Sequence, residues 1–305
     1  MKAIITTQYG PPEVMTIREV DKPVVKDHDV LIKIKAIAVT SGDCRVRAFR
    51  IPKWYFWVPM RLALGIFKPR QPIQGLWWAG EIETTGSAVT KFKIGQQVYG
   101  RTVDLEFGAN AEYISLTENA IMDLKPTNLT HEVSVALPFG GITALHFLRK
   151  ATLRKGEKIL VYGASGAVGS SAVQLANYFG AEITTVCSTQ NIEWVKNLGA
   201  HKTIDYTKED FTAIPDRFDV VFDAVGYINQ AMAKKILKPD SQFISVITSG
   251  HADDGVESLH YLTDLAEKGI FKPVIDKIYP FDQMVEAHRY VDQGHKKGNV
   301  VVRVY

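Results

Sequence analysis

The sequence predicts an α/β protein in which a doubly wound parallel sheet is joined to a β-rich domain. Three observations predict this fold class. Short strands with alternating polar and apolar residues dominate roughly the first 120 residues. Apolar strands then alternate with helical stretches from about residue 126 onward, and a glycine-rich turn joins one of these strands to a helix. The chain of 305 residues is long enough for one large domain or two medium ones.

The β-rich part shows the pattern of strands that have one solvated face. Residues 30–37 alternate apolar and polar side chains, and residues 79–86 and 97–100 form shorter strand-and-turn units of the same kind. Connections this short favour antiparallel neighbours, so we expect a mostly antiparallel domain.

The second part alternates helices and strands. Thr130 is suited to cap a helix that runs to Lys150, and Gly199 stands where a C-cap glycine is preferred after a helix over 191–198. Strands separated by helices imply parallel pairing through right-handed crossovers. We expect strands at 158–162, 182–186, 219–223 and 242–247, and further helices at 168–179, 230–237 and 258–268.

The C-terminal stretch contains an amphipathic helix over 281–291 and a strand that begins at Asn299. We expect this strand to return to the β-rich domain and make it discontinuous. The predicted domains are therefore 1–124 with 274–305, and 125–273.

The composition excludes several classes of protein. A net charge of +3 without a long block of like charges gives no reason to expect a nucleic-acid partner. The two cysteines, Cys44 and Cys187, cannot form a disulfide framework and favour a reducing compartment. No secretion signal opens the chain, and no apolar run reaches the roughly 18 residues of a membrane span. We expect a cytoplasmic protein with no membrane partner.

The segment Gly163-Ala-Ser-Gly-Ala-Val-Gly169 lies directly between a predicted strand and a predicted helix. Glycines at this spacing permit a tight turn and let the backbone approach a pyrophosphate, while the helix N-terminus offers N–H donors. The alternative is a plain strand-to-helix turn that binds nothing. The context favours dinucleotide binding, with contacts from Gly163, Ser165, Gly166, Ala167, Val168 and Gly169.

The end of the next strand bears on the choice of cofactor. Sites for NAD usually hold the ribose 2′-hydroxyl with a carboxylate about 20 residues further on, but residues 186–191 contain no acid. Ser188 and Tyr206 are candidates to contact a 2′-phosphate. No Arg or Lys stands at this corner, so NADPH is favoured while NADH stays open.

Several segments carry a family resemblance. The glycine loop, placed after a β-rich half, resembles the medium-chain dehydrogenase/reductase superfamily, and within it the zinc-free quinone oxidoreductases related to zeta-crystallin. This resemblance implies a Rossmann cofactor domain and a GroES-like catalytic domain. Matching segments are 137–148 (LPFGGITALHFL), 198–206 (LGAHKTIDY), 222–226 (FDAVG), 287–291 (AHRYV) and 294–300 (GHKKGNV).

The resemblance also implies roles for single residues. Thr143, Val225, Val246 and Asn299 match positions near the cofactor, and Ile247 replaces a glycine that relatives often have. Where zinc-dependent relatives place a first cysteine ligand, this chain has Thr40, shortly before Asp43. It has Gly75-Leu-Trp77 where they place a histidine, and it lacks their four-cysteine lobe. We therefore expect no metal, and we interpret Cys44 as a small residue beside the pocket.

Four adjacent aromatic residues start at Trp54, in a region where relatives place a loop over the substrate. Trp54, Tyr55 and Trp57 could stack a flat ring, or the segment could be a packed loop. Thr40, Asp43 and Tyr55 are candidate catalytic residues. Asp43 is equally suited to cap a turn. Tyr55 does not align with the proton-donating tyrosine of related enoyl thioester reductases, where Ile51 stands.

Without a metal ion as a Lewis acid, reduction of an electrophilic carbon is easier than oxidation of a simple alcohol. We therefore expect an NADPH-dependent reductase of quinones or α,β-unsaturated carbonyls. One alternative is an enoyl thioester reductase, with Arg45, Arg47, Arg50 and Lys53 as a phosphate patch unless they form a solvated face. A cofactor-binding protein with little activity is another. Relatives carry a longer segment after the strand at 242–247, with an edge strand used in dimerisation. Its absence suggests a monomer or an atypical homodimer.

Overall fold

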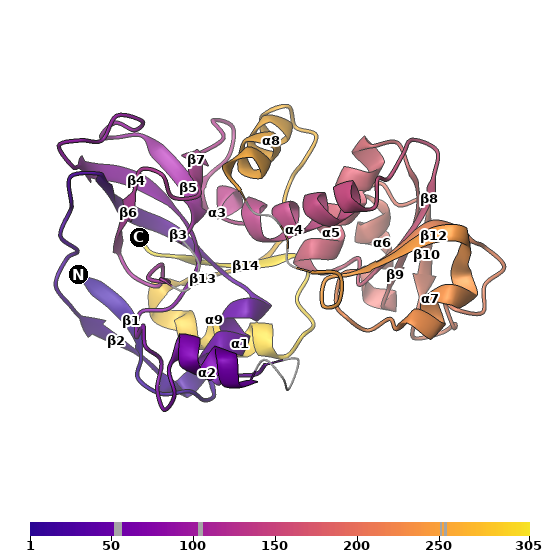
Figure 1. Cartoon of the computed structure of the whole chain (residues 1–305), viewed down its shortest axis with the longest axis horizontal. Helices are drawn as coiled ribbons and strands as arrows, with labels where there is room; N and C mark the ends of the chain where they lie inside the picture. The colour runs from indigo at the N-terminus through magenta and orange to yellow at the C-terminus, as the bar shows by residue number, and fades with distance from the viewer. Residues whose placement is uncertain (52–56, 103–105, 251, 253–254) are drawn as a thin grey trace. The chain divides into compact units, whose positions relative to one another are not determined.

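The computed structural model describes residues 1–51, 57–102, 106–250, 252 and 255–305, and divides into two compact units (Figure 1). Unit 1 comprises Met1–Pro138 and Ile275–Tyr305, and unit 2 comprises Phe139–Val274. The predicted domain limits after residues 124 and 273 stay a prediction. No helix among the described residues is long and apolar enough to cross a membrane.

Unit 1 is built on a seven-stranded sheet with the order β13-β14-β3-β4-β5-β7, in which β6 also pairs with β3. All its neighbours are antiparallel except β13 and β14. A separate hairpin pairs β1 with β2. The strands are β1 (Lys2–Thr6), β2 (Met15–Glu19), β3 (Asp29–Val39), β4 (Trp77–Thr85), β5 (Gln97–Arg101), β6 (Tyr113–Thr117), β7 (Met122–Leu124), β13 (Ile275–Pro280) and β14 (Asn299–Arg303).

The C-terminal strand returns to this sheet as the sequence predicts. In β14, Val300 lies opposite Val39 of β3, and Arg303 lies opposite Ala36. The core between the sheet and helix α9 (Met284–Asp292) is apolar and includes Ile34, Trp78 and Met284. Helix α9 also packs beside α1 (Ser41–Ala48), which directly follows β3 (Figure 1).

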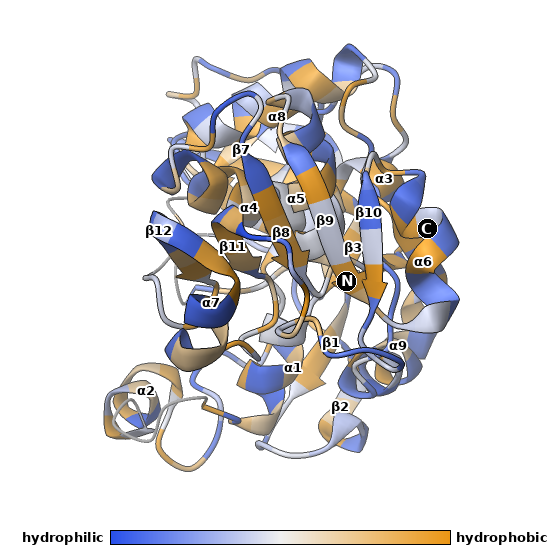
Figure 2. Ribbon diagram, turned by 90° about the vertical axis from the view of Figure 1, so that its right-hand side faces the viewer, coloured by the Kyte–Doolittle hydropathy of each residue, from blue (hydrophilic) through white to orange (hydrophobic). Residues whose placement is uncertain are grey.

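Unit 2 contains a five-stranded, fully parallel sheet with the order β10-β9-β8-β11-β12. Its central strand β8 is almost wholly apolar and buried, as expected for a strand covered on both faces. Figure 2 shows helices beside these strands, with hydrophilic residues on α7. The strands are β8 (Lys158–Tyr162), β9 (Glu182–Cys187), β10 (Lys202–Asp205), β11 (Phe218–Asp223) and β12 (Leu237–Ser245).

The helices largely follow the predicted pattern. Thr130 caps α3 through its side chain, which accepts a hydrogen bond from the Val133 N–H. The predicted helix to Lys150 is two helices, and the second has Pro138, which lacks an N–H, in its first turn. The helices are α2 (Trp57–Leu64), α3 (His131–Ser134), α4 (Leu137–Lys150), α5 (Ala167–Tyr178), α6 (Ile192–Lys196), α7 (Gln230–Ile236) and α8 (Val256–Glu267), with short 3-10 turns at Pro12–Val14, Thr189–Asn191 and Phe281–Gln283.

Strand β12 forms one edge of the parallel sheet in the part of the chain that the structure describes. It carries Pro239, a residue confined to edge strands and bulges because it cannot donate to a neighbour, and Asp240 has a positive φ of 58°. Helix α8 follows after a short connection.

Candidate functional site

The glycine loop follows β8 and is hydrogen-bonded to β9. The backbone N–H groups of Gly163 and Ala164 both donate to the Val186 carbonyl, at 3.1 and 3.3 Å. The Gly166 N–H then donates to the Gly163 carbonyl at 3.1 Å, and helix α5 begins at Ala167. The first N–H groups of a helix have no partner within the helix, so this end presents donors and a partial positive charge.

Each of the three glycines of the loop lacks a side chain for a different structural reason. Gly163 has a φ of +75°, which other residues rarely adopt. A Cβ at Gly169 would lie 2.1 Å from the Gly163 carbonyl oxygen, so α5 could not approach the loop. At Gly166 the backbone is extended (φ −81°, ψ 175°), and a Cβ would meet only the Gly163 oxygen at 3.6 Å. The loop at Gly166 is therefore bare beside a helix N-terminus, which fits an approaching pyrophosphate.

A buried carboxylate holds the neighbouring turn, and the sequence analysis did not identify it. Asp223 ends β11 and accepts hydrogen bonds from the N–H groups of Val225, Gly226 and Ile228, at 2.9 to 3.1 Å. This turn lies against the glycine loop, because a Cβ at Gly163 would lie 3.1 Å from the methyl groups of Val225. An acid at the end of a buried strand was the available signal.

The residues after β12 complete this end of the sheet. The Val246 N–H donates to the Asp223 carbonyl at 3.1 Å, which places Val246 beside the same turn. Ile247 packs over Gly226, where a Cβ would lie 2.3 Å from its Cγ1 atom. The bulky side chain of Ile247 therefore covers the backbone of the turn.

Ser188 and Tyr206 are brought to the same corner. Asp205 of β10 lies opposite Cys187 of β9, so the residues that follow them, Tyr206 and Ser188, leave the sheet side by side. The Ser188 hydroxyl accepts a hydrogen bond from the Asn191 amide at 2.9 Å. The structure also brings the Asp205 carboxylate here, where it accepts hydrogen bonds from the Thr189 and Thr207 hydroxyls.

An aromatic groove of about 590 Å³ lies beside this corner. The ring of Tyr162, at the end of β8, stacks on Tyr227 with 5.1 Å between centroids and 9° between planes. Tyr206 and Phe211 also contact Tyr162, at 6.3 and 5.1 Å. Lys208 and Lys235 stand among the polar residues that line the groove. A flat aromatic ring fits such a surface.

Two residues assigned by resemblance lie on other elements. Thr143 is on α4, and its hydroxyl donates to the Phe139 carbonyl of the same helix at 2.7 Å. Asn299 opens β14 in unit 1, opposite Ile275, and is 4% exposed. Their roles toward a cofactor stay predictions.

Thr40 and Asp43 form a reciprocal capping box at the start of α1. The Thr40 backbone N–H and hydroxyl both donate to Asp43 Oδ2, at 2.8 and 2.6 Å, and Thr40 Oγ1 accepts from the Asp43 N–H at 3.2 Å. Both side chains are buried. These contacts are the ones that a capping carboxylate makes.

Asp43 should make the stability of the fold depend on pH. Burial raises the pKa of this carboxyl from 3.8 to about 6, although its hydrogen bonds to Thr40 act in the opposite direction. The carboxyl is therefore more readily protonated in the folded chain than in the unfolded chain. The resulting contribution to the free energy of unfolding is complete below about pH 4 and is lost as the pH rises through about 6. We expect the unfolding free energy of the parent to fall by about 3 kcal/mol, relative to the Asp43→Asn variant, between about pH 3 and 7. Urea unfolding of both proteins across this range measures it, and parallel pH dependences would contradict it.

A buried polar network lies behind α1 and corrects one interpretation of the sequence. Arg47 is 1% exposed; its guanidinium lies 3.1 Å from His288 Nδ1 and donates to Asp292 at 2.6 Å. Arg50 also binds Asp292. The predicted phosphate patch or solvated face is therefore wrong for Arg47, which is inside the fold and neutralised by a carboxylate of α9.

Cys44 belongs to the same network. Its Sγ atom lies 3.5 Å from His288 Nδ1, and burial raises the pKa of this thiol to about 12. Burial and the nearby Arg47 lower the pKa of His288 to about 3. Among the described residues, no three His, Cys, Asp or Glu side chains are grouped as metal ligands would be.

Of the three predicted pocket aromatics, Trp57 is described, whereas Trp54 and Tyr55 lie outside the described residues. Trp57 opens α2 and is 49% exposed. Its ring meets Phe49 edge-on at 5.9 Å between centroids, and the Arg61 guanidinium lies 5.1 Å from it. These contacts are those of a residue packed on α2, and they leave part of the ring accessible.

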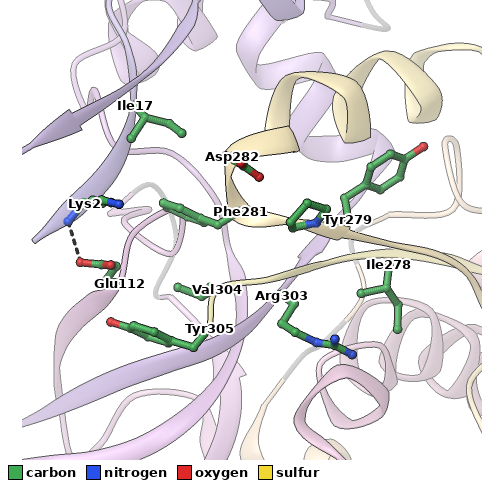
Figure 3. Close-up of a pocket in the computed structure, with 11 residues that line it drawn as sticks. Lys2, Ile17, Glu112, Ile278, Tyr279, Phe281, Asp282, Arg303, Val304 and Tyr305 are labelled. Atoms are coloured by element: carbon green, nitrogen blue, oxygen red, sulfur yellow. Dashed lines mark hydrogen bonds between the residues drawn. The ribbon is translucent and has the colours of Figure 1, made fainter.

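A separate cavity of about 450 Å³ in unit 1 contains none of the predicted site residues (Figure 3). Two of its charged side chains have hydrogen-bond partners: Glu112 Oε2 accepts from the Lys2 backbone N–H at 2.7 Å, and Arg303 Nε donates to Glu132 at 2.6 Å. Tyr305 and Phe281 provide aromatic walls (Figure 3). The glycine loop and the corner beside it therefore form the better candidate site.

Comparisons with known proteins show which family the chain resembles. Residues 26–126 match the family described as "Alcohol dehydrogenase GroES-like domain", and residues 198–258 and 247–302 match "Zinc-binding dehydrogenase". The chain is 37% identical to a 2-methylene-furan-3-one reductase of Solanum lycopersicum, and 31% identical to a chloroplastic NADPH-dependent alkenal/one oxidoreductase of Arabidopsis thaliana. Each match covers 99% of this chain and 79% of the relative. The solved quinone oxidoreductase of Coxiella burnetii superposes with a TM-score of 0.89 at 28% identity, over 100% of this chain and 99% of that one.

Proposed function

This chain belongs to the medium-chain dehydrogenase/reductase superfamily, within its zinc-free quinone oxidoreductase family, and we propose that it uses NADPH to reduce quinones or α,β-unsaturated carbonyl compounds. The observation that carries the proposal is the bare backbone of Gly166 at the N-terminus of α5. NADPH oxidation in the presence of a quinone or a short enone tests it, and the absence of turnover with either would contradict it.

A nicotinamide dinucleotide is the cofactor of this oxidoreductase, and we propose NADPH as the preferred form. The corner at Ser188 offers a hydroxyl where NAD sites usually have a carboxylate. The nearby Asp205 carboxylate is already bonded to Thr189 and Thr207. The Arabidopsis relative is named as NADPH-dependent. The adenine end would lie along the groove formed by Tyr162, Tyr206 and Tyr227.

The residues of the chain have mainly a positioning role. When bound, the reduced nicotinamide supplies a hydride to an electrophilic carbon of the substrate. The loop over Gly163–Gly169 and the end of α5 would hold the pyrophosphate, and Val225 and Val246 would bound the cofactor beside the turn that Asp223 fixes. Thr143 and Asn299 are proposed near the nicotinamide end by resemblance. Holding the reacting groups in place provides much of the rate enhancement in such a site.

The proton that completes the reduction need not come from a dedicated acid. Both Thr40 hydrogen bonds to Asp43 stay within the capping box, so we propose a structural role for this pair. Solvent can protonate the oxyanion or carbanion left after reduction. A quinone or an enone suits such a site better than a simple alcohol, whose alkoxide needs a Lewis acid. We propose that Trp57 borders the substrate.

The structure reduces the support for the thioester alternative. Arg47 is buried and Arg50 is paired with Asp292, so two of the four cations of the proposed phosphate patch are occupied.

For assembly, the edge position of β12, with its proline, supports a monomer or an atypical homodimer. Light scattering that found a dimer joined along β12 would contradict this. A cytoplasmic location stays our proposal.

Replacing Ser188 by aspartate should reverse the preference between cofactors. A carboxylate at this corner would repel a 2′-phosphate and accept a hydrogen bond from a 2′-hydroxyl. We expect the affinity for NADPH to fall by about tenfold or more, and that for NADH to rise. Titrations of cofactor fluorescence measure both constants, and Ser188→Asn is the uncharged control. Equal affinities in Ser188→Asp and the parent would place the 2′-phosphate elsewhere.

A further inference from the structure

Unit 1 exposes a group of large apolar side chains on α2 and the turn that follows it. Soluble proteins scatter such residues singly, whereas here they fall within eleven consecutive positions. Figure 2 draws α2 mostly in the colour of hydrophobic residues. We call this surface the α2 face; its members and their exposed fractions are Trp57 (49%), Val58 (61%), Leu62 (58%), Ile66 (54%) and Phe67 (91%).

The α2 face is a fixed part of the fold. The opposite side of α2 packs through Leu64 onto a core that includes Phe49 and Phe107. The turn is tied back to the helix, because Arg61 donates to the Ile66 carbonyl and Arg70 donates to the Leu62 carbonyl, each at 2.8 Å. The exposed side chains therefore cannot turn inward without breaking these contacts.

The segment that carries the α2 face has cations and no acid. Residues 57–70 contain Arg61, Lys68 and Arg70 and no Asp or Glu. Lys68 and Arg70 are exposed directly beside Ile66 and Phe67. An apolar surface with exposed cations beside it is complementary to a partner that is both apolar and negatively charged.

We propose that the α2 face binds the surface of an anionic lipid bilayer. Apolar side chains including Leu62 and Phe67 would enter the boundary between head groups and acyl chains, while Lys68 and Arg70 meet lipid phosphates. This mode needs no membrane-spanning helix. A second copy of the chain is a poorer occupant, because a two-fold interface would bring Lys68 and Arg70 of both copies together. The proposal is independent of the reductase activity.

Sedimentation of the full chain with lipid vesicles tests the proposal. We expect binding to phosphatidylcholine vesicles that contain about a third phosphatidylserine, weaker binding to pure phosphatidylcholine, and weaker binding as salt rises from about 0.1 to 0.5 M. Phe67→Glu and Leu62→Glu should each reduce affinity by about tenfold or more, and Lys68→Glu should reduce it and weaken its salt dependence. Both glutamates replace exposed side chains, so the fold and the turnover of NADPH should persist.

Ile94→Glu is the matched control. Ile94 is 65% exposed in unit 1, lies beside Lys93 and is not part of the α2 face. This variant should bind vesicles as the parent does. The proposal would be overturned if the parent did not sediment with anionic vesicles, or if Ile94→Glu lost as much affinity as Phe67→Glu. A parent dimer that Phe67→Glu converts to a monomer, without vesicle binding by either, would assign the α2 face to a second copy instead.

Discussion

Replacing Gly166 by valine is expected to lower the affinity for NADPH by about a hundredfold while leaving the fold intact. The backbone at Gly166 is extended, and a Cβ there would make only an ordinary van der Waals contact, 3.6 Å from the Gly163 oxygen, so we expect the apo chain to accept a valine. Its methyl groups would instead fill the space from which a pyrophosphate reaches the N–H donors of α5. Losing two charge-assisted hydrogen bonds accounts for a change of this size.

Fluorescence titration with NADPH measures this effect, and urea unfolding verifies that stability is preserved. Gly255→Val is the matched control, because Gly255 also stands at the N-cap of a helix in extended conformation (φ −60°, ψ 163°) but begins α8. This control should bind NADPH as the parent does. Parental affinity in Gly166→Val would show that the glycine loop does not hold the pyrophosphate.

Replacing Gly169 by alanine, unlike the change at Gly166, should lower the stability of the fold itself, by about 3 kcal/mol. An added Cβ would lie 2.1 Å from the Gly163 carbonyl oxygen and 2.7 Å from Ala164 Cα. Both are backbone atoms, so helix α5 must shift away from β8 to relieve the contact. A rotamer change cannot relieve it.

The shift in the midpoint of urea unfolding, followed by circular dichroism, measures this loss. Gly166→Ala is the internal control, since its Cβ would lie 3.6 Å from its nearest neighbour and should cost little stability. If Gly169→Ala unfolded at the same urea concentration as Gly166→Ala, the close packing of α5 on the loop would be wrong.

Four of the five strands of the parallel sheet could be predicted because their signals are local, whereas β10 was not predicted. Strand β8 is apolar along nearly its whole length, and the glycines that end it are required by a positive φ at Gly163 and by helix packing at Gly169. Thr130 at the N-cap of α3 and Gly199, with a φ of +111°, likewise act within a few residues of their own positions. Such features follow from sequence alone.

The parts that could not be predicted depend on contacts between distant segments. Arg47 looks like a surface cation, yet it is buried because Asp292, 245 positions later, meets it from α9. Asp205 reaches the Ser188 corner only through the pairing of β10 with β9. Strand β13 was missed because its residues are largely polar or exposed, so that only pairing with β14 defines it.

The central claim is tested most directly by following NADPH absorbance with phenanthrenequinone, para-benzoquinone and a short enone, in the presence of a metal chelator and with NADH in parallel. We predict turnover that the chelator does not reduce and that is faster with NADPH, because positioning at the glycine loop, without a metal, supports the reaction. Tight NADPH binding without turnover of any of these acceptors would contradict the reductase function. A rate lost to the chelator and restored by zinc would contradict its metal-free mechanism.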